Sequence, residues 1–365
     1  MSTAERAIMP TSSAVARLAP AEEAEWEDFV KNHPEASIYH SLAWREVTRE
    51  GLGHQPYYLR ARDADGRISG VLPLFLVTGI FGRRLVSVPM RDRGGVLTRD
   101  IATASALVEG AIELRDKLRC NYLELRSLGE LPAEVVAANG LTESPHWVTT
   151  RIDLTPGADA LWKRLDRDAI RWAINRGRRT GLTVTVDDSA DGAELFYELF
   201  VRTRCAMGIP PFPRELFRAI HRHLIVPERA ILMIVRKGDV PIHGLISFLS
   251  GDTIVPAYAA PQNAYRKDYP NELVFWEAIA WACARGYKTL DFGADSPRQT
   301  GLLWFKSKWG GVQHQMHYYV QAAAGRSAPT FDSSAPTFEL ARRIWRRLPA
   351  AIARPLGAWT TRQLS

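Results

Sequence analysis

The feature that most constrains the fold of this 365-residue chain is a unit of secondary structure that occurs twice. In the first half, PYYLRARDADGRISGVLPLFLV predicts a hairpin, and a helix near 103–119 and the strand NYLELRS follow. In the second half, ILMIVRKGDVPIHGLISFLS predicts the same hairpin, followed by the strand TIVPAYAA, a helix over 271–285 and the strand KTLDFGA. Each final strand carries a central acidic residue, Glu124 or Asp291. The long period indicates an internal duplication of a whole domain.

The second copy contains a pattern suited to binding an anion. A polar loop over 262–272 joins TIVPAYAA to the next helix, and Asn271 is predicted to cap that helix. The order of strand, loop and helix N-terminus leaves backbone N–H groups unpaired beside the positive end of a helix dipole. Acyltransferases of the Gcn5-related (GNAT) type hold an acyl carrier at such a place. An ordinary crossover between two strands explains the same pattern.

Further segments resemble the successive signatures of FemAB-type proteins: SIYHSLAWREV, VPMRDRGGVL, AIRWAINRGRRTGLTV and LLWFKSKWGG. The resemblance covers roughly residues 25–320 and is closest to the FemAB-related proteins of the exosortase/PEP-CTERM system, with the BioF2-like acetyltransferase domains as a sister group. It implies an α/β fold of two tandem GNAT-like domains with mixed, mostly antiparallel sheets flanked by helices. Founding members transfer amino acids from aminoacyl-tRNA to peptidoglycan precursors. This chain lacks the long helical-hairpin insertion of some members, so the donor stays open between acyl-CoA and aminoacyl-tRNA.

Length and composition fit a two-domain cytoplasmic protein. The predicted division is a disordered lead-in over 1–20, a first GNAT-like domain over 21–150, a second over 151–321, and a linker with a helix over 322–365. No apolar run reaches the roughly 18–20 residues of a membrane helix. The first residues lack the apolar core of a secretory signal. The three cysteines stand far apart, which predicts reduced thiols and no zinc site.

Positive charge is concentrated between Lys163 and Arg179, where seven residues are basic and two are acidic. On one continuous helix, Arg164, Arg167, Arg171 and Arg178 would share a face. Such a stripe suits a nucleotide-sugar pyrophosphate, a polyanionic lipid carrier or tRNA, and a solvated outer face is the alternative. The FemAB resemblance implies that Arg171 and Arg176 lie on the acceptor side of a groove.

Beyond a flexible linker, FELARRIWRRLP predicts a basic amphipathic helix of about ten residues that ends at Pro349. One interpretation is peripheral contact with the anionic inner membrane, where lipid-linked glycan or peptide precursors are built. The other is a helix folded back onto the protein or onto a second subunit.

Three residues of the second copy are candidates for catalysis. The resemblance places Lys306 near acyl transfer, where its cation would stabilise a tetrahedral intermediate, and a surface lysine is the alternative. Asp291, in a strand expected to be buried, is either a general base for an incoming amine or a structural hydrogen-bonding group, and Asp295 is its rival. Tyr269 is the candidate acid for the leaving group, with Tyr258 and Tyr265 nearby.

The remaining candidates bind substrates. Gln262, Tyr265, Arg266 and Asn271 in the polar loop are predicted to contact the donor. The resemblance places Tyr39, His40, Arg91 and Asp92 on a groove between the domains, where they would contact the acceptor, although an isolated histidine is more often structural. His314 and His317 point to opposite faces of a strand, so no metal is implied.

These observations predict an N-acyltransferase that moves an acyl or aminoacyl group from acyl-CoA or aminoacyl-tRNA to an amine of a cell-envelope or exopolysaccharide precursor. The alternative is a non-catalytic double-GNAT protein that binds a nucleotide sugar or another polyanion. A pure nucleic-acid binder is less well supported, because no known nucleic-acid module surrounds the basic residues.

Overall fold

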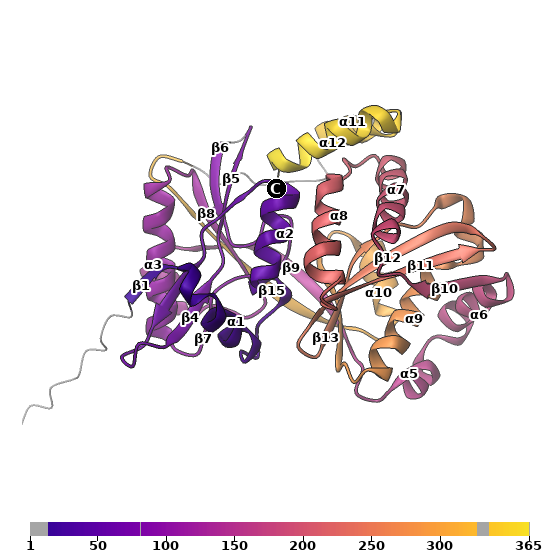
Figure 1. The fold of residues 1–365 in the computed structure, drawn as a ribbon, viewed down its shortest axis with the longest axis horizontal. Helices are drawn as coiled ribbons and strands as arrows, with labels where there is room; N and C mark the ends of the chain where they lie inside the picture. The colour runs from indigo at the N-terminus through magenta and orange to yellow at the C-terminus, as the bar shows by residue number, and fades with distance from the viewer. Residues whose placement is uncertain (1–13, 81, 327–335, 365) are drawn as a thin grey trace, which may run out of the picture.

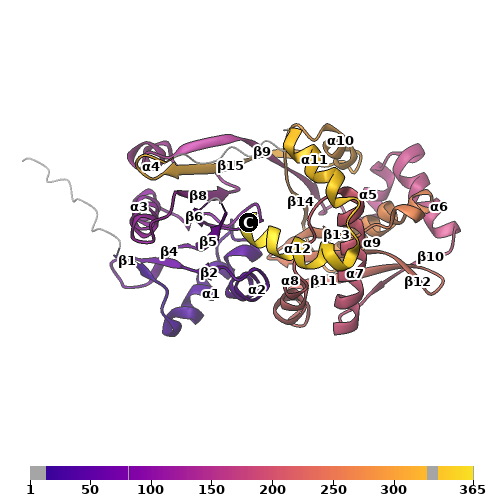
Figure 2. The ribbon, with the colours of Figure 1, turned by 90° about the horizontal axis from the view of Figure 1, so that it is seen from above.

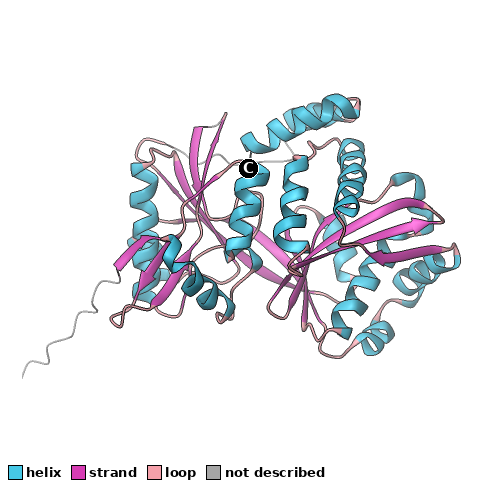
Figure 3. Cartoon of the chain, viewed as in Figure 1, coloured by secondary structure: helices cyan, strands magenta, loops and turns pink. Residues whose placement is uncertain are grey.

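Two halves of similar design lie side by side in the computed structural model, which describes residues 14–80, 82–326 and 336–364 (Figure 1). In both halves, sheets are flanked by helices (Figure 3). Among these residues, two strand pairs are parallel, β6–β8 and β13–β14, and all the others are antiparallel. The predicted α/β fold with mixed, mostly antiparallel sheets is confirmed.

The first half contains short strands and helix α3, which connects the parallel pair. Its strands are β1 (Ala14–Arg17), β2 (Gln55–Pro56), β3 (Leu59–Arg62), β4 (Ile68–Leu72), β5 (Phe75–Gly79), β6 (Gly82–Val86), β7 (Leu97–Thr98) and β8 (Tyr122–Ser127). Its helices are η1 (Pro20–Glu22), α1 (Glu23–Lys31), η2 (Ile38–His40), α2 (Leu42–Leu52), α3 (Ile101–Lys117) and α4 (Ala133–Ala138). Asp100 caps α3 by accepting a hydrogen bond from the backbone N–H of Thr103.

The second half repeats this order with mostly longer strands. Its strands are β10 (Leu182–Val186), β11 (Ala230–Lys237), β12 (Val240–Ser250), β13 (Thr253–Ala259) and β14 (Thr289–Asp295). Its helices are α5 (Ala158–Arg164), η3 (Arg167–Arg171), α6 (Trp172–Arg179), α7 (Ala190–Met207), α8 (Arg214–Ile220), η4 (His221–Ile225), η5 (Asn263–Asp268), α9 (Pro270–Ala284) and α10 (Thr300–Ser307). Helix α9 joins parallel strands β13 and β14, as α3 joins β6 and β8. The element order therefore carries the duplication seen in the sequence.

Two long strands exchange partners between the halves. β9 (Thr142–Asp153) follows the first half but pairs with β14 of the second, whereas β15 (Val312–Ala322) follows the second half but pairs with β8 of the first. β9 and β15 also pair with each other, and Figure 2 shows them running from one half to the other. The described residues thus form one sheet of eleven strands in addition to the sheet β1-β3-β4-β7. The predicted boundary between residues 150 and 151 falls inside β9.

Apolar packing also crosses the boundary. Trp44 of α2 lies 5.5 Å from the Phe248 ring of β12, and both belong to one buried cluster. Gly51 of α2 allows α8 to approach closely, since a Cβ there would lie 2.6 Å from Leu216 Cα. The two halves are therefore joined by packed side chains as well as by strands.

Two local predictions are wrong. Residues 14–17 fall in the lead-in expected to be disordered but form β1, which pairs with β3. The single basic helix expected over 163–179 is broken, because Leu165 takes an extended backbone and the Asp166 side chain caps the next turn. The basic residues on either side of this break do not share one helix face.

The C-terminal segment folds back across both halves as α11 (Pro336–Trp345) and α12 (Ala350–Leu364) (Figure 1). Arg354 forms an ion pair with Glu198 of α7, and a Cβ on Gly357 would lie 2.4 Å from Pro211. The interpretation of a helix folded back onto the protein is the one observed, with two helices in place of one. Most of the expected linker, 327–335, lies outside the described residues. No helix among the described residues is long and apolar enough to span a membrane.

Candidate active site

The two parallel strands of the second half part at their carboxyl ends. β13 and β14 pair only through Thr253–Thr289 and Ile254–Leu290. Beyond these residues, β13 pairs with β12 and β14 pairs with β9. Ligands of open α/β sheets bind at such a place, beyond the carboxyl ends of strands and beside the start of the connecting helix. This end of the β13–β14 pair is the centre of the candidate site.

Helix α9 starts beside the carboxyl end of the β13–β14 pair, and no side chain caps its first turn. Its N-cap residue is Tyr269, with a left-handed φ of 59°, and Pro270 takes the first helical position. Asn271 lies inside the first turn, and its Oδ1 is 3.3 Å from Nε2 of the buried His243. The prediction that Asn271 caps α9 is therefore wrong, and its side chain faces β12. The N-cap side chain accepts no hydrogen bond from the first N–H groups of α9.

The other predicted donor residues have different surroundings. Gln262 donates hydrogen bonds to the Leu199 carbonyl at 3.0 Å and to Thr203 at 3.2 Å, so its amide faces α7. Tyr265 packs against the core. Arg266 is exposed on η5. Of this group, Arg266 is the residue that offers a charge to a ligand at the start of α9.

A buried cluster of charged side chains joins the two halves next to β14. We call Asp92, Arg93, Asp291, Asp295 and Lys306 the interface charge cluster. Arg93 of the first half donates two hydrogen bonds to Asp291 of β14, at 2.5 and 2.7 Å. Arg93 also donates to Asp92 at 3.0 Å, and Asp92 accepts a hydrogen bond from the Ala294 backbone N–H at 3.0 Å. Arg93 was not among the predicted site residues, although it lies between predicted site residues and a Gly-Gly pair.

Asp291 cannot serve as a general base in this setting. Its side chain is fully buried, and it accepts hydrogen bonds from Arg93, Thr149 and the Gly293 backbone N–H. Burial by itself would raise the pKa of Asp291, but the charge of Arg93 and these hydrogen bonds outweigh it and lower the pKa to about 2. Burial and these contacts favour the structural alternative for Asp291 over its predicted role as a base.

Lys306 is buried on α10, not on a surface strand. Its Nζ donates to the Phe292 carbonyl at 3.1 Å and forms an ion pair with Asp295 at the end of β14. Burial lowers the pKa of Lys306 and raises the pKa of Asp295, and each charge opposes the shift of the other. This pair places an ammonium at the carboxyl end of β14, where the β13–β14 pairing has ended.

Tyr269 is half-buried, and its ring lies edge-on to Trp172 of α6 at 5.1 Å. Within the described residues, no hydrogen bond or ring contact links Tyr269 to the interface charge cluster. Its assignment as the acid for the leaving group remains a prediction. Glu272, in the first turn of α9, is a candidate that sequence reasoning missed, and burial raises its pKa. An acidic residue in the first turn of a helix is too common to have indicated it.

Two of the predicted acceptor residues are structural. Tyr39 is buried among Trp44 and Phe248. His40 accepts a hydrogen bond from the Ser37 backbone N–H and donates one to the Gly95 carbonyl at 3.1 Å. Burial lowers the pKa of His40 to about 4, so it does not titrate near neutrality as expected.

Arg91 has the properties of a ligand-binding cation. Its guanidinium stacks on the Tyr258 ring at 4.0 Å, and its Nε and Nη2 atoms are buried without a hydrogen-bond partner. Arg204 of α7 stacks on Phe212, which in turn contacts Tyr258. Burial lowers the pKa of Arg204 to about 10, and Arg91 adds to this effect. Arg91 thus stacks on Tyr258 and Arg204 lies one aromatic ring away, at the junction of the halves.

Arg171 and Arg176 lie elsewhere. Figures 1 and 2 place α6 on the outer side of the second half, remote from the first half. Arg176 is exposed there, and Arg171 lines a surface cavity of 370 Å³ with Arg167, Trp172 and Arg179. Because Trp172 contacts Tyr269 before α9, this cavity borders the donor loop. The structure does not bring Arg171 and Arg176 to the other predicted acceptor residues.

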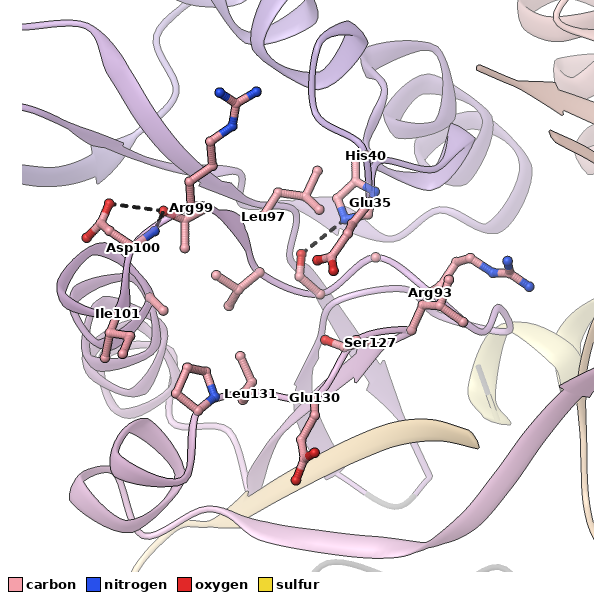
Figure 4. A pocket seen from close by; sticks show the side chains of 18 residues that line it. Glu35, His40, Arg93, Leu97, Arg99, Asp100, Ile101, Ser127, Glu130 and Leu131 are labelled. Atoms are coloured by element: carbon pink, nitrogen blue, oxygen red, sulfur yellow. Dashed lines mark hydrogen bonds between the residues drawn. The ribbon is translucent and has the colours of Figure 1, made fainter. Parts of the chain in front are cut away.

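A smaller cavity of 190 Å³ lies in the first half, between the end of β8 and the start of α3 (Figure 4). Glu35, Arg99, Ser127 and Glu130 line it together with apolar residues, whereas the Arg93 guanidinium points away. Its position matches that of the candidate site in the second half, beside the start of α9. Its exposed carboxylates, Glu35 and Glu130, make it unsuited to an anionic carrier. Among the residues described, no group of three or more metal-ligating side chains occurs.

Comparison with known proteins identifies the class of this fold. Residues 165–299 match the family model described as an acetyltransferase (GNAT) domain. This segment contains β13, η5, α9 and β14 and ends just before α10. No curated protein matches the chain.

Solved structures extend the likeness to the whole chain. The crystal structure of FemX has a TM-score of 0.69 at 16% identity. The match covers 90% of this chain and 100% of the FemX chain. A tandem GNAT protein from the clavulanic acid biosynthesis pathway has a TM-score of 0.56 at 15% identity. The match covers 86% of this chain and 99% of that protein. The C-terminal domain of a putative lysylphosphatidylglycerol synthetase from Agrobacterium fabrum has a TM-score of 0.56 at 15% identity. The match covers 84% of this chain and 94% of that domain. The chain therefore has the tandem GNAT fold that the FemAB resemblance implied. The exosortase/PEP-CTERM association has no counterpart among these similarities.

The Arg93–Asp291 pair makes stability depend on acidity. Because the folded pKa of Asp291, about 2, lies below the unfolded value of about 3.9, its contribution is present above pH 4 and is lost as pH falls toward 2. At neutral pH, Asp291→Asn removes one of the two carboxylates that pair with the buried Arg93, leaves Asp92 as the other, and should cost about 1–3 kcal/mol in urea unfolding. Asp252→Asn, at an exposed ion pair, should cost less than about 0.5 kcal/mol. An equal loss in both variants, or unchanged acid sensitivity in Asp291→Asn, would contradict the assignment.

Proposed function

We propose that this chain is an N-acyltransferase that transfers an acyl or aminoacyl group to an amine of a cell-envelope or exopolysaccharide precursor. The observation that carries the proposal is the end of the β13–β14 pairing beside the uncapped start of α9, inside the segment that matches the GNAT domain. A GNAT domain implies acyl-CoA as donor. The similarity to FemX and to a putative lysylphosphatidylglycerol synthetase, whose name refers to a lysyl group, keeps an aminoacyl-tRNA donor open.

The acceptor would bind at the junction of the halves through an anionic group. Arg91 stacks on Tyr258, Arg204 lies one aromatic ring away, and two buried nitrogens of Arg91 have no hydrogen-bond partner. A phosphate or diphosphate accepts several such hydrogen bonds at once. This chemistry fits a precursor that carries a phosphate group.

The reaction would occur between the two sites. The neutral acceptor amine attacks the donor carbonyl, and negative charge develops on the carbonyl oxygen. As the carbonyl re-forms, the bond to the carrier sulfur or oxygen breaks, and the proton lost by the amine nitrogen ends on the departing thiol or hydroxyl. Lys306 places its cation at the end of β14 and would stabilise the developing charge. Asp291 holds β14 against the first half by its bond to Arg93, and takes no proton.

The cavity beside α6 favours a second candidate function. Arg167, Arg171 and Arg179 surround Trp172 there, which suits the phosphates and base of a nucleotide. In a purely binding protein, this cavity would hold a nucleotide sugar or another polyanion without turnover. In the transferase, the same cavity would receive the distal phosphate of the donor.

The donor site can be tested by thermal shift. Acyl-CoA should raise Tm, because a ligand that binds only the folded state stabilises it. Arg266→Glu at the start of α9 should weaken this effect, and Arg285→Glu at the other end of the same helix should not. A shift with charged tRNA but none with any acyl-CoA would assign the donor to tRNA. Binding without transfer to any amine would favour the second candidate.

Lys306 can be tested with its ion-pair partner removed. Lys306→Met alone leaves Asp295 buried and unpaired, so the double variant Lys306→Met/Asp295→Asn is the cleaner comparison. If Lys306 stabilises the intermediate, kcat should fall about 10²–10³-fold in both variants with little change in KM. Lys308→Met is the matched control, since the Lys308 ammonium lies over Trp304 at 3.6 Å. Recovery of kcat in the double variant would show that Lys306 only positions β14.

The two interface arginines can be tested with inorganic pyrophosphate. Pyrophosphate should raise Tm of the wild-type protein, and added salt should weaken the effect. Arg91→Met and Arg204→Met should each remove most of the shift. Arg229→Met, at an ion pair about half exposed on the arginine side, should leave it unchanged. A shift that survives both substitutions would place the anion elsewhere.

A further inference from the structure

We propose that the outer face of α11 and α12 docks on an anionic lipid surface. The proposal rests on side chains that the protein leaves uncovered and does not depend on the proposed reaction. Figure 1 shows the two helices lying across the edge of both halves, so a surface that binds them would orient the whole molecule.

Helix α12 has apolar residues on two opposite faces. Ala353, Gly357 and Thr361 recur every four residues and are buried against the protein. Ile352, Leu356 and Trp359 recur at four and three residues on the other face and are 51%, 41% and 52% exposed. A surface helix normally presents polar residues to water, so the outer face of α12 lacks the expected pattern.

Neighbouring elements extend this apolar face. Ile344 of α11 is 54% exposed. Met207, 50% exposed, precedes Gly208, where an added Cβ would meet the Arg342 backbone. Ile80, 61% exposed, follows Gly79, which meets the Gln363 backbone in the same way. These contacts place Met207 and Ile80 beside the two helices, so the apolar side chains come from both halves.

The charge of the segment selects the partner. Residues 341–364 contain six arginines and no aspartate or glutamate. Arg354 and Arg362 bind Glu198 and Glu215, while Arg343, Arg346 and Arg347 are exposed. Apolar side chains flanked by arginines are the composition of helices that lie in the interface of an anionic membrane. A tryptophan at such a face suits the headgroup region, because its ring is apolar and its N–H is polar.

The docked position of the helices strengthens the inference. A helix of this length binds membranes weakly when it is free, because it loses conformational entropy on binding. Here Arg354 and Gly357 already fix α12 on the folded protein, so its apolar face is presented in a fixed orientation. The acceptor residue Arg204 lies on α7, which α12 contacts through Glu198. Docking would therefore bring the junction of the halves near a lipid surface.

Vesicle sedimentation tests the proposal. The full-length protein should bind vesicles of phosphatidylglycerol and phosphatidylcholine, bind pure phosphatidylcholine weakly, and lose binding as salt rises. Arg343→Glu/Arg346→Glu/Arg347→Glu should weaken binding by at least about tenfold, because each cation near an anionic surface contributes roughly fivefold. Ile352→Ser/Leu356→Ser/Trp359→Ser should weaken it similarly through lost apolar burial.

Matched variants on other surfaces are the controls. Lys31→Glu/Arg67→Glu/Lys117→Glu changes the same net charge at exposed positions, and Val186→Ser/Val226→Ser/Val240→Ser removes exposed apolar residues. Both should bind within about twofold of wild type, and all variants should unfold with a Tm close to that of the wild-type protein. Absence of vesicle binding, or equal losses in the controls, would overturn the proposal. So would a wild-type dimer in solution that the apolar α12 variant dissociates, because a second copy would then cover this face.

Discussion

The paired hydrogen bonds between Arg93 and Asp291 hold the candidate site together. A fully buried carboxylate is stable only when its charge and its hydrogen-bonding capacity are met, and Arg93 from the other half supplies most of both. The second half therefore has a β14 strand that is satisfied only in the presence of the first half. Strand exchange by β9 and β15 produces the same dependence through the backbone. Each half needs the other to complete its sheet and its share of the interface charge cluster.

One short loop of the first half serves both candidate substrate sites. Arg91 reaches β13 through the Tyr258 ring and the Ala257 carbonyl, whereas Asp92 accepts a hydrogen bond from Ala294 of β14. The loop thus bonds to each of the two strands beyond the point where they stop pairing. An acceptor bound to Arg91 would be held on the same backbone that fixes the donor strands. The two candidate sites are therefore related through direct contacts of this one loop.

The sequence predicts the fold well because the repeat order and turn residues are local signals. The sequence does not predict contacts between residues that are far apart along the chain. Apolar and polar residues alternate along β9 and β15 in the same way whichever half these strands pair with. The sequence pattern therefore does not reveal the strand exchange. Arg93 has no sequence neighbour that indicates Asp291, almost two hundred residues away. A motif indicates Lys306, but its burial and its bond to Asp295 depend on where β14 ends. Asn271 has the right chemistry for a cap, but Pro270 starts the helix one residue earlier.

Charge explains why the candidate chemistry lies in the second half although both halves share one design. Both halves have a helix that starts beside the end of a parallel pair. In the first half Asp100 caps α3, and Glu35 and Glu130 line the adjacent cavity. In the second half α9 has no side-chain cap, and Arg266, Arg171 and Lys306 lie around the equivalent region. A helix start without a side-chain cap and with nearby cations favours an anionic carrier, so the second half is the better candidate for the donor site. The first half supplies Arg93, which holds β14, and Arg91, which would bind the acceptor under the proposed function.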